Sequence, residues 1–312
     1  MTATAAPRPT TRDQLIGMIS LAFGLSIFGL QDAFIKLMSG GYAVHEIVFV
    51  RSVVALPIVL LVAARESRGF PRLRMLWMHA VRGLLMYLSY NLYYLAIARI
   101  SIAENASLYS VAPLFVTVLG ALVLGERVGK RTWIALAVSG FGVLLILRPA
   151  SGDFNPAFVF PLLSALAYAL TTVCTRRLGR TEQPGALALS VTVIYVLGSA
   201  ITGLALAGAA PAAEGSLFQF MLYPWRVPEP GDFGLMVVCG LISAIGFICI
   251  SQGYRLAEAN RAAPFEYSTM PSSVLWGYVF FQYVPSLQTI TGAVIVVLGG
   301  LYALRLDRRA AA

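Results

Sequence analysis

Charged residues are scarce in this chain: Asp, Glu, Lys and Arg make up 12% of the 312 residues. A soluble domain carries about 25%. Apolar residues make up 58%, and long apolar runs recur from residue 14 to residue 305. The scarcity of charge excludes an ordinary soluble domain, and the recurrence of the runs excludes a soluble core with a single anchor. This composition is typical of an integral membrane protein.

Cysteine and histidine are also scarce, with three and two residues respectively. Cys174, Cys239 and Cys249 all fall inside apolar runs, and the sequence has no CxxC or Cys/His spacing. That pattern argues against a disulfide framework and a metal centre, and we expect no other cofactor. His, Asp and Glu do not cluster at one membrane interface, as an enzyme acting on lipid would require. We therefore predict that the protein is not an enzyme.

A nucleotide-binding loop is lacking as well. The GERVGKRT segment at 125–132 has three residues between its glycines where a phosphate loop has four. In the same segment Arg131 stands where a magnesium-binding Ser or Thr is needed. The net charge of +9 is spread over short loops between apolar runs and is not gathered on one segment. We predict neither nucleotide drive nor a nucleic-acid partner.

The apolar runs have the length that a membrane-spanning helix needs, roughly 20 residues. They are too long and too uniformly apolar for the strands of a membrane barrel. The sequence therefore predicts an all-α integral membrane bundle of ten transmembrane helices. The predicted spans are 15–38, 43–64, 75–98, 103–125, 131–148, 155–176, 185–208, 232–255, 262–282 and 286–305.

Most of the 23 Lys and Arg residues fall on one side of these spans, near the termini and in every second loop. Arg99, Arg148 and Arg226 are the basic residues of the opposite side. The positive-inside rule then places both termini in the cytoplasm, in a bacterial-type inner (plasma) membrane. An even number of spans agrees with that orientation.

The second half of the chain repeats a pattern of the first. The segment YSVAP from Tyr109 recurs as YSTMP from Tyr267, which aligns Pro113 with Pro271. We predict two five-helix repeats, 1–150 and 151–312, with opposite orientations because five is odd. Inverted repeats of this kind enclose a central cavity in many secondary transporters. The alternative is a chance similarity between apolar helices.

These features resemble EamA-type transporters of the drug/metabolite transporter superfamily. The resemblance rests on the five-plus-five helices, the central proline followed by GER at 125–127, the glycine-rich GFG at 140–142 and LGG at 298–300, and Lys36 at the end of the first span. It covers nearly the whole chain. In one departure, FQYVPS at 281–286 replaces the acidic turn that family members often repeat in the second half.

The resemblance implies a secondary transporter that moves a small amphipathic metabolite by alternating access. Export of an amino acid, as in exporters of the YddG type, is the first expectation. Import of a flavin, a nucleoside-like compound or S-adenosylmethionine is the alternative, and a passive channel is the alternative from another class. The expected partners are the small-molecule substrate and the lipid bilayer, with the chain as a monomer or homodimer.

Polar side chains inside apolar spans are costly and therefore indicate a site. The predicted helix 75–98 presents a polar stripe at helical spacing, which can face either a cavity or a neighbouring helix. Repeat symmetry adds tyrosines from the spans 103–125 and 262–282, and the span 155–176 adds another. The predicted substrate-binding residues are Tyr87, Tyr90, Asn91, Tyr94, Tyr109, Tyr168, Tyr267, Arg82 and His79. Tyr94, with Tyr93, has the alternative of an interfacial anchor.

Three ionisable residues are candidates for coupling or gating. Asp32 and Arg51 lie at a similar depth on neighbouring helices, so an ion pair between them is geometrically possible, either as a structural pair that holds two helices together or as a gate or substrate contact. Glu266 is the candidate protonatable group, with a structural pair to Arg82 as the alternative. Gly292 and Gly299 share a face of the last helix, which we expect to pack outside the cavity.

Overall fold

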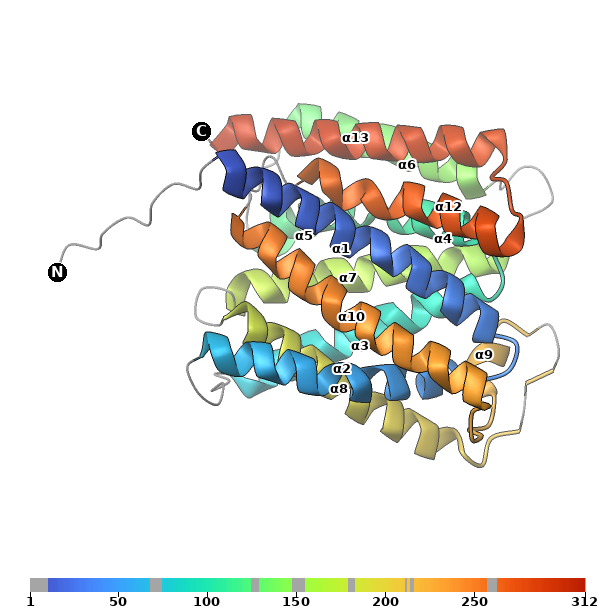
Figure 1. Ribbon diagram of the computed structural model, residues 1–312. Coiled ribbons are helices and arrows are strands. Elements are labelled where there is room, and N and C mark those ends of the chain that lie inside the picture. Colours follow the sequence, from blue (N-terminus) through green and yellow to red (C-terminus); the bar gives the residue numbers. More distant parts are fainter. Residues whose placement is uncertain are drawn as a thin grey trace.

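The computed structural model describes residues 11–67, 75–124, 129–147, 155–178, 183–210, 212–213, 216–256 and 263–311, and every regular element in these ranges is helical (Figure 1). The elements of the first half are α1 (Thr11–Met38), α2 (Val44–Glu66), α3 (Leu76–Ile97), α4 (Ile102–Tyr109), α5 (Ala112–Leu124) and α6 (Lys130–Leu147). Those of the second half are the 3-10 turn η1 (Pro156–Phe158), α7 (Val159–Leu178), α8 (Pro184–Leu206), the short α9 (Gln219–Leu222), α10 (Pro230–Leu256), η2 (Ala263–Ser268), α12 (Thr269–Phe281) and α13 (Leu287–Ala311).

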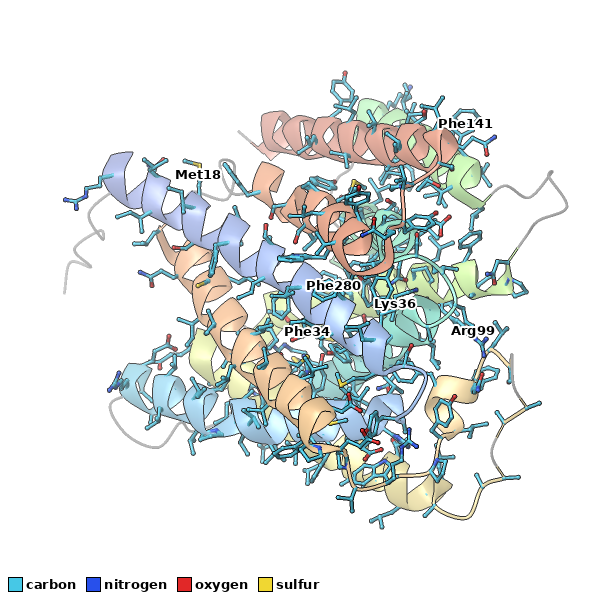
Figure 2. All side chains as sticks on the ribbon, turned by 45° about the vertical axis from the view of Figure 1, so that its right-hand side comes forward. Met18, Phe34, Lys36, Arg99, Phe141 and Phe280 are labelled. Carbon is cyan, nitrogen blue, oxygen red and sulfur yellow. The ribbon has the colours of Figure 1, made fainter. Side chains whose placement is uncertain are left out.

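Within the part of the chain that the structure describes, six segments are long and apolar enough to cross a membrane. They are Gln14–Met38, Val44–Glu66, Ile102–Val123, Pro156–Thr175, Gly185–Leu206 and Pro230–Ile250. Large apolar side chains on the outside of the bundle, such as Phe141 at 57% exposure, point away from the protein (Figure 2). Such a surface requires lipid rather than water around it. The chain is therefore a multi-pass membrane protein.

Two of the predicted spans are interrupted. The expected helix 103–125 divides into α4, which ends at Tyr109, and α5. The expected helix 262–282 likewise divides into η2 and α12. Pro113 and Pro271 each lie in the first turn of the second segment, where the missing N–H costs no helical hydrogen bond. Each of these two predicted spans therefore consists of two segments, with a proline at the same place in both.

Helix packing follows a pattern that relates the two halves. α1 packs against α10 and α12, and correspondingly α7 packs against α3 and α5. α2 packs against α10 and α3 packs against α8, while α2 with α8 and α6 with α13 form two further pairs. The two halves are related by exchanging α1 with α7, α2 with α8, α3 with α10, α5 with α12 and α6 with α13. This exchange converts α1–α10 into α7–α3, α1–α12 into α7–α5 and α2–α10 into α8–α3, and it leaves the α2–α8 and α6–α13 pairs unchanged.

The α6–α13 pair lies at one side of the bundle, as Figure 1 shows. Gly142 and Gly292 face each other so closely that a Cβ on either would lie 2.7 or 2.6 Å from the other's carbonyl oxygen. Gly299 contacts Ser139 of α6. The prediction that the last helix packs through its glycines is confirmed, and its partner is α6.

The bundle has two distinct ends. The terminal end holds Thr11 at the start of α1 and Ala311 at the end of α13 (Figure 1). The distal end, to which α1 runs, holds the turn 39–43 and the segment 223–229 before α10. A buried polar region lies between the two ends, and it is described next.

Candidate functional site

Tyrosine rings form a connected group in the middle of the bundle. Tyr90 lies 4.3 Å from Tyr94 and 5.3 Å from Tyr195, measured between ring centroids. Tyr93 lies 5.3 Å from Tyr94 and 5.2 Å from Tyr109. Tyr109 in turn lies 5.8 Å from Tyr168. We call these six residues the tyrosine cluster: Tyr90, Tyr93 and Tyr94 of α3, Tyr109 of α4, Tyr168 of α7 and Tyr195 of α8.

Asp32 of α1 is held by this cluster. Its Oδ1 accepts a hydrogen bond from the Tyr94 hydroxyl at 2.7 Å, and its Oδ2 accepts one from Tyr93 at 2.8 Å. The residue is only 6% exposed. Within the described part of the chain, no basic nitrogen lies within 4.0 Å of the carboxylate. Asp32 is therefore a buried acid whose direct partners are phenol hydroxyls, while the charge of Arg51 acts on it only from a distance.

Arg51 of α2 lies at the other side of the cluster. It is 2% exposed, and its Nη1 donates to Ser243 Oγ of α10 at 2.8 Å. The guanidinium carbon lies 4.3 Å from the ring centroid of Tyr90 and 5.4 Å from that of Tyr195. A cation over an aromatic face gains about 0.5–2 kcal/mol. Its buried Nε has no hydrogen-bond partner among the described residues.

The predicted Asp32–Arg51 ion pair is therefore wrong. Each charge makes its own contacts, to hydroxyls in one case and to Ser243 and aromatic faces in the other. Gln31 connects the two. With its amide oriented so that each polar atom meets a complementary group, its oxygen lies 3.2 Å from the hydroxyls of Tyr90 and Tyr94 and 3.2 Å from Arg51 Nη1.

Arg82 and His79 lie closer to the terminal end, in a different environment. Arg82 is 7% exposed and donates from Nε to Thr175 Oγ1 at 2.8 Å. Its Nη1 donates to the Leu187 carbonyl at 2.9 Å and to Ser190 Oγ at 3.2 Å. His79 Nδ1 lies 3.0 Å from the same Ser190 hydroxyl. These two predicted site residues tie α3 to α7 and α8.

Tyr87 and Asn91 extend the predicted stripe of α3. The Tyr87 hydroxyl donates to Thr202 Oγ1 of α8 at 3.1 Å, and its ring lies 6.1 Å from that of Tyr195. Asn91 Nδ2 donates to the carbonyl of Tyr87 at 2.8 Å, and its buried Oδ1 has no partner in the described part of the chain. Tyr87 therefore contacts the tyrosine cluster with its ring and joins α3 to α8 with its hydroxyl.

The two candidates of η2 do not extend the cluster. Tyr267 is buried, and its hydroxyl lies against Gly300 of α13. The prediction that Tyr267 faces Tyr109 across a cavity is not supported by that position. Glu266 lies in η2, but its side chain is outside the described part of the structure. Its predicted coupling role, and its alternative pair with Arg82, remain predictions.

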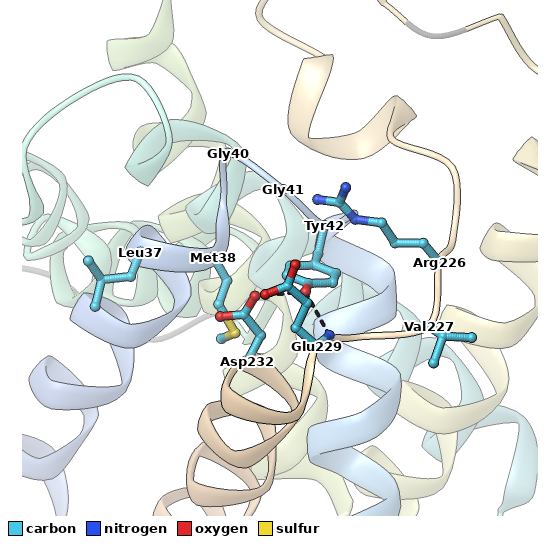
Figure 3. A pocket seen from close by; sticks show the side chains of 9 residues that line it. All are labelled: Leu37, Met38, Gly40, Gly41, Tyr42, Arg226, Val227, Glu229 and Asp232. Atoms are coloured by element: carbon cyan, nitrogen blue, oxygen red, sulfur yellow. Dashed lines mark hydrogen bonds between the residues drawn. The ribbon is translucent and has the colours of Figure 1, made fainter.

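The distal end holds a set of contacts that we call the distal latch: Tyr42, Glu46, Arg226, Glu229 and Asp232. Figure 3 shows all of these residues except Glu46. The Tyr42 hydroxyl donates to Asp232 Oδ2 at 2.7 Å and accepts from the Glu229 backbone N–H at 3.1 Å. The Arg226 guanidinium lies 4.7 Å from the Tyr42 ring centroid, and its backbone N–H donates to Glu46 Oε1 at 3.4 Å. The hydrogen bond to Asp232 raises the pKa of Tyr42. The latch joins the α1–α2 turn to the segment before α10.

Gln31 and Tyr195 are the site residues that the sequence did not reveal. Tyr195 is the one tyrosine of the predicted span 185–208, and the residues that share its helix face, Thr192, Ser199 and Thr202, are small hydroxyl residues of the kind that usually make packing contacts in membrane helices. Gln31 directly precedes Asp32, and its uncharged amide carries a weaker signal than the neighbouring acid. Tyr93 was assigned to the membrane interface as an alternative, but it holds the Asp32 carboxylate.

The arrangement is suited to binding. The tyrosine cluster offers aromatic faces, and it contacts a buried cation, Arg51, and a buried acid, Asp32. Arg51 can accept an anionic group, Asp32 a cationic one, and the rings an apolar or planar body.

Three relatives of this chain are named as transporters of small molecules. The chain is 28% identical over 273 residues to the riboflavin transporter of Vibrio cholerae, covering 87% of this chain and 82% of that protein. It is 24% identical over 304 residues to the S-adenosylmethionine uptake transporter of Rickettsia prowazekii, covering 95% and 94%. It is 27% identical over 288 residues to the pseudopaline exporter of Pseudomonas aeruginosa, covering 90% and 93%.

A solved crystal structure superposes with a TM-score of 0.61 at 18% sequence identity, covering 98% of this chain and all of that one. This likeness supports the fold alone. The profile of the EamA-like transporter family matches two segments, residues 15–148 and 155–305. Together they span most of the sequence. The chain therefore belongs to the EamA-like transporter family, within the drug/metabolite transporter superfamily.

Proposed function

We propose that this protein is a secondary transporter that exports a small amphipathic metabolite, in the first place an amino acid, by alternating access across the inner membrane. The observation that carries the proposal is Arg51, a buried guanidinium with hydrogen-bonding capacity that the protein does not use. Asp32 and the tyrosine cluster complete the site.

Burial of a charge is costly unless the charge is paired. A guanidinium has five N–H donors. Arg51 uses Nη1 for Ser243, while its Nε is buried without a partner in the described part of the chain. Its cation–π contacts offset only part of the cost. A bound carboxylate, which a guanidinium recognises in a bidentate manner, would supply the missing acceptors.

Asp32 favours a zwitterion over a simple anion as the cargo. The carboxylate lies in the same connected group as Arg51, through Gln31, Tyr90 and Tyr94. An ammonium group on the cargo would neutralise it. The cargo's side chain would pack on the tyrosine faces, which accept apolar and planar groups alike.

The architecture we propose is ten transmembrane helices in two inverted five-helix repeats, 1–150 and 151–312, with both termini in the cytoplasm. The exchange symmetry of the packing pairs supports it, as do the breaks before Pro113 and Pro271. The orientation rests on the distribution of Lys and Arg. Alternating access would open the distal latch in one state and the terminal end in the other.

Import of a flavin or of S-adenosylmethionine is a second candidate. The names of two relatives, a riboflavin transporter and an S-adenosylmethionine uptake transporter, favour it. A planar ring system would stack on Tyr90 and Tyr195, whose centroids are 5.3 Å apart. These cargoes would use the aromatic faces more and the two charges less.

Counterflow in proteoliposomes tests the proposal. Vesicles preloaded with one unlabelled compound from a panel of amino acids, riboflavin and S-adenosylmethionine are given the labelled compound outside. We expect transient accumulation with an amino acid, and its loss in Arg51→Gln. Accumulation with riboflavin alone would select the second candidate. Uptake without any stimulation by internal cargo would indicate a passive channel and reject the proposal.

A further inference from the structure

A cavity lies at the distal end, and no residue of the tyrosine cluster lines it. It has a volume of about 480 Å³ and is bounded by the end of α1, the α3–α4 turn and the end of α12. We call it the distal vestibule and define it by Lys36, Arg99, Glu104 and Phe281, all of which line it. Figure 2 shows Lys36 and Arg99 at this end of the bundle.

Lys36 has a donor to spare. Its ammonium donates to the carbonyls of Ile97 at 2.7 Å and Ile100 at 2.5 Å, at the carboxyl end of α3, where a cation is favourable. It also lies 5.6 Å from the ring centroid of Phe281. An ammonium has three donors. The third has no acceptor among the described residues, although Lys36 lines the cavity.

Arg99 also has donors to spare. Its Nη2 donates to Gln219 Oε1 at 2.8 Å and to the Ser216 carbonyl. Its remaining N–H groups have no acceptor in the described part of the chain. The acid of the vestibule, Glu104, accepts through Oε2 from the Ser101 hydroxyl at 2.8 Å and from the Ser101 N–H at 3.2 Å, and its single charge offsets only part of the charge of Lys36 and Arg99. The vestibule therefore has an excess of positive charge with unused donors.

The vestibule lies beside the tyrosine cluster. Lys36 is four residues beyond Asp32 on α1, about one helical turn or 6 Å nearer the distal end. Asn105, next to Glu104, donates to the carbonyl of Tyr93 at 3.2 Å, and Tyr93 holds Asp32. A cargo that moves between the distal surface and the cluster would pass Lys36 first.

We propose that the distal vestibule is a second binding site, which takes the carboxylate or phosphate of a small anionic or zwitterionic metabolite between Lys36 and Arg99. The apolar part of the metabolite packs on Phe281. That the occupant is the transported cargo rests on the function proposed above, whereas the anion site itself does not. The competing interpretation is that Lys36 only caps α3.

The sequence permits a direct test, because Lys36 and Lys130 are its only lysines. Lys130 is exposed at the start of α6 and serves as an internal control. Pyridoxal 5′-phosphate and pyridoxal, which lacks the phosphate, are compared as probes on the full chain in lipid nanodiscs. The aldehyde condenses with the lysine amine and releases water. Borohydride then reduces the imine to a stable amine, and mass spectrometry quantifies each lysine.

We expect saturable labelling of Lys36 that is about tenfold faster with the phosphorylated probe, as a charge-assisted hydrogen bond implies. Labelling of Lys130 should not saturate and should proceed at similar rates with the two probes. Arg99→Gln should remove the preference at Lys36. Gln219→Ala, which removes a tether of Arg99 but keeps its charge, should retain it.

Equal rates with the two probes, absence of labelling at Lys36, or a preference unchanged by Arg99→Gln would overturn the proposal. Protection of Lys36 in discs of phosphatidylglycerol, compared with phosphatidylcholine, would assign the site to a lipid headgroup and also reject it. None of these outcomes depends on transport, so the result is separable from a failure of the proposed function.

Discussion

Two buried arginines of this protein have opposite environments. Arg82 donates three hydrogen bonds to fixed acceptors on α7 and α8. Arg51, although even less exposed, donates only from Nη1, to Ser243 and Gln31; its Nε has no partner among the described residues, and its guanidinium faces aromatic rings. A guanidinium saturated by the protein has a structural role, because it has little capacity left for a ligand. One whose Nε is buried and unpaired is ready to bind a ligand.

The largest expected effect comes from Arg51→Gln. We expect the affinity for the cargo to fall by about 100-fold, since a bidentate charge-assisted contact is lost. The melting temperature should change little, because the protein itself makes few hydrogen bonds to this side chain. Binding measured by isothermal titration and a thermal melt in detergent would check both. An Arg51→Gln variant with normal affinity for the cargo but a lowered melting temperature would show that Arg51, like Arg82, has a structural role.

The next effect concerns Asp32. Asp32→Asn retains the shape but removes the charge that Tyr93 and Tyr94 hold. We expect transport of a zwitterion to fall by about tenfold, with a smaller loss for an analogue without the ammonium group.

If Asp32 or Glu266 couples transport to protons, its amide variant should lose uphill transport while retaining exchange. Glu266→Gln is the matched variant in the second half of the chain. If both variants transport the cargo uphill at the same rate as the unmodified protein, proton coupling through these acids is rejected.

Arg82→Gln should show the reverse of Arg51→Gln. It leaves acceptors on Thr175, Leu187 and Ser190 without their donor. A cost of about 1–3 kcal/mol in the free energy of unfolding is expected, equivalent to a fall in melting temperature of about 2–5 °C for a chain of this length. The affinity for the cargo should stay within about threefold. A large loss of affinity for the cargo at unchanged stability would place Arg82 in the binding site, and the two arginines would then not differ in role.

The smallest expected effect is that of Tyr195→Phe. The Tyr195 hydroxyl makes one long hydrogen bond, 3.4 Å to the Met86 carbonyl, whereas its ring faces Arg51 and Tyr90. We expect less than about a twofold change for Phe, and about a tenfold loss for Tyr195→Ala, which removes the aromatic face. Equal losses in the two variants would show that the hydroxyl, and not the ring, is what matters.

Much of the site was predictable because ionisable and polar groups stand out in apolar helices. Asp32, Arg51 and the stripe of α3 were found in this way. The ion pair was wrong because sequence position gives depth along a helix but not the direction in which a side chain faces. At that depth the hydroxyls of Tyr93 and Tyr94 reach the carboxylate.

The repeat misled at Tyr267 for a geometric reason. Tyr109 ends an α-helix, whereas Tyr267 lies in the 3-10 turn η2. A 3-10 turn has three residues per turn and an α-helix 3.6, so equivalent positions lose their common phase. Tyr195 could not be found from the sequence because its role depends on contacts with α2 and α3 that no local pattern records.

The central claim is that Arg51 receives the carboxylate of the cargo, and one binding comparison tests it most directly. The affinities of the cargo and of its methyl ester are measured for the unmodified protein, for Arg51→Gln and for Arg82→Gln. The account predicts that the unmodified protein and Arg82→Gln prefer the free carboxylate by about 10- to 100-fold, and that Arg51→Gln has no preference. A preference that persists in Arg51→Gln would contradict it.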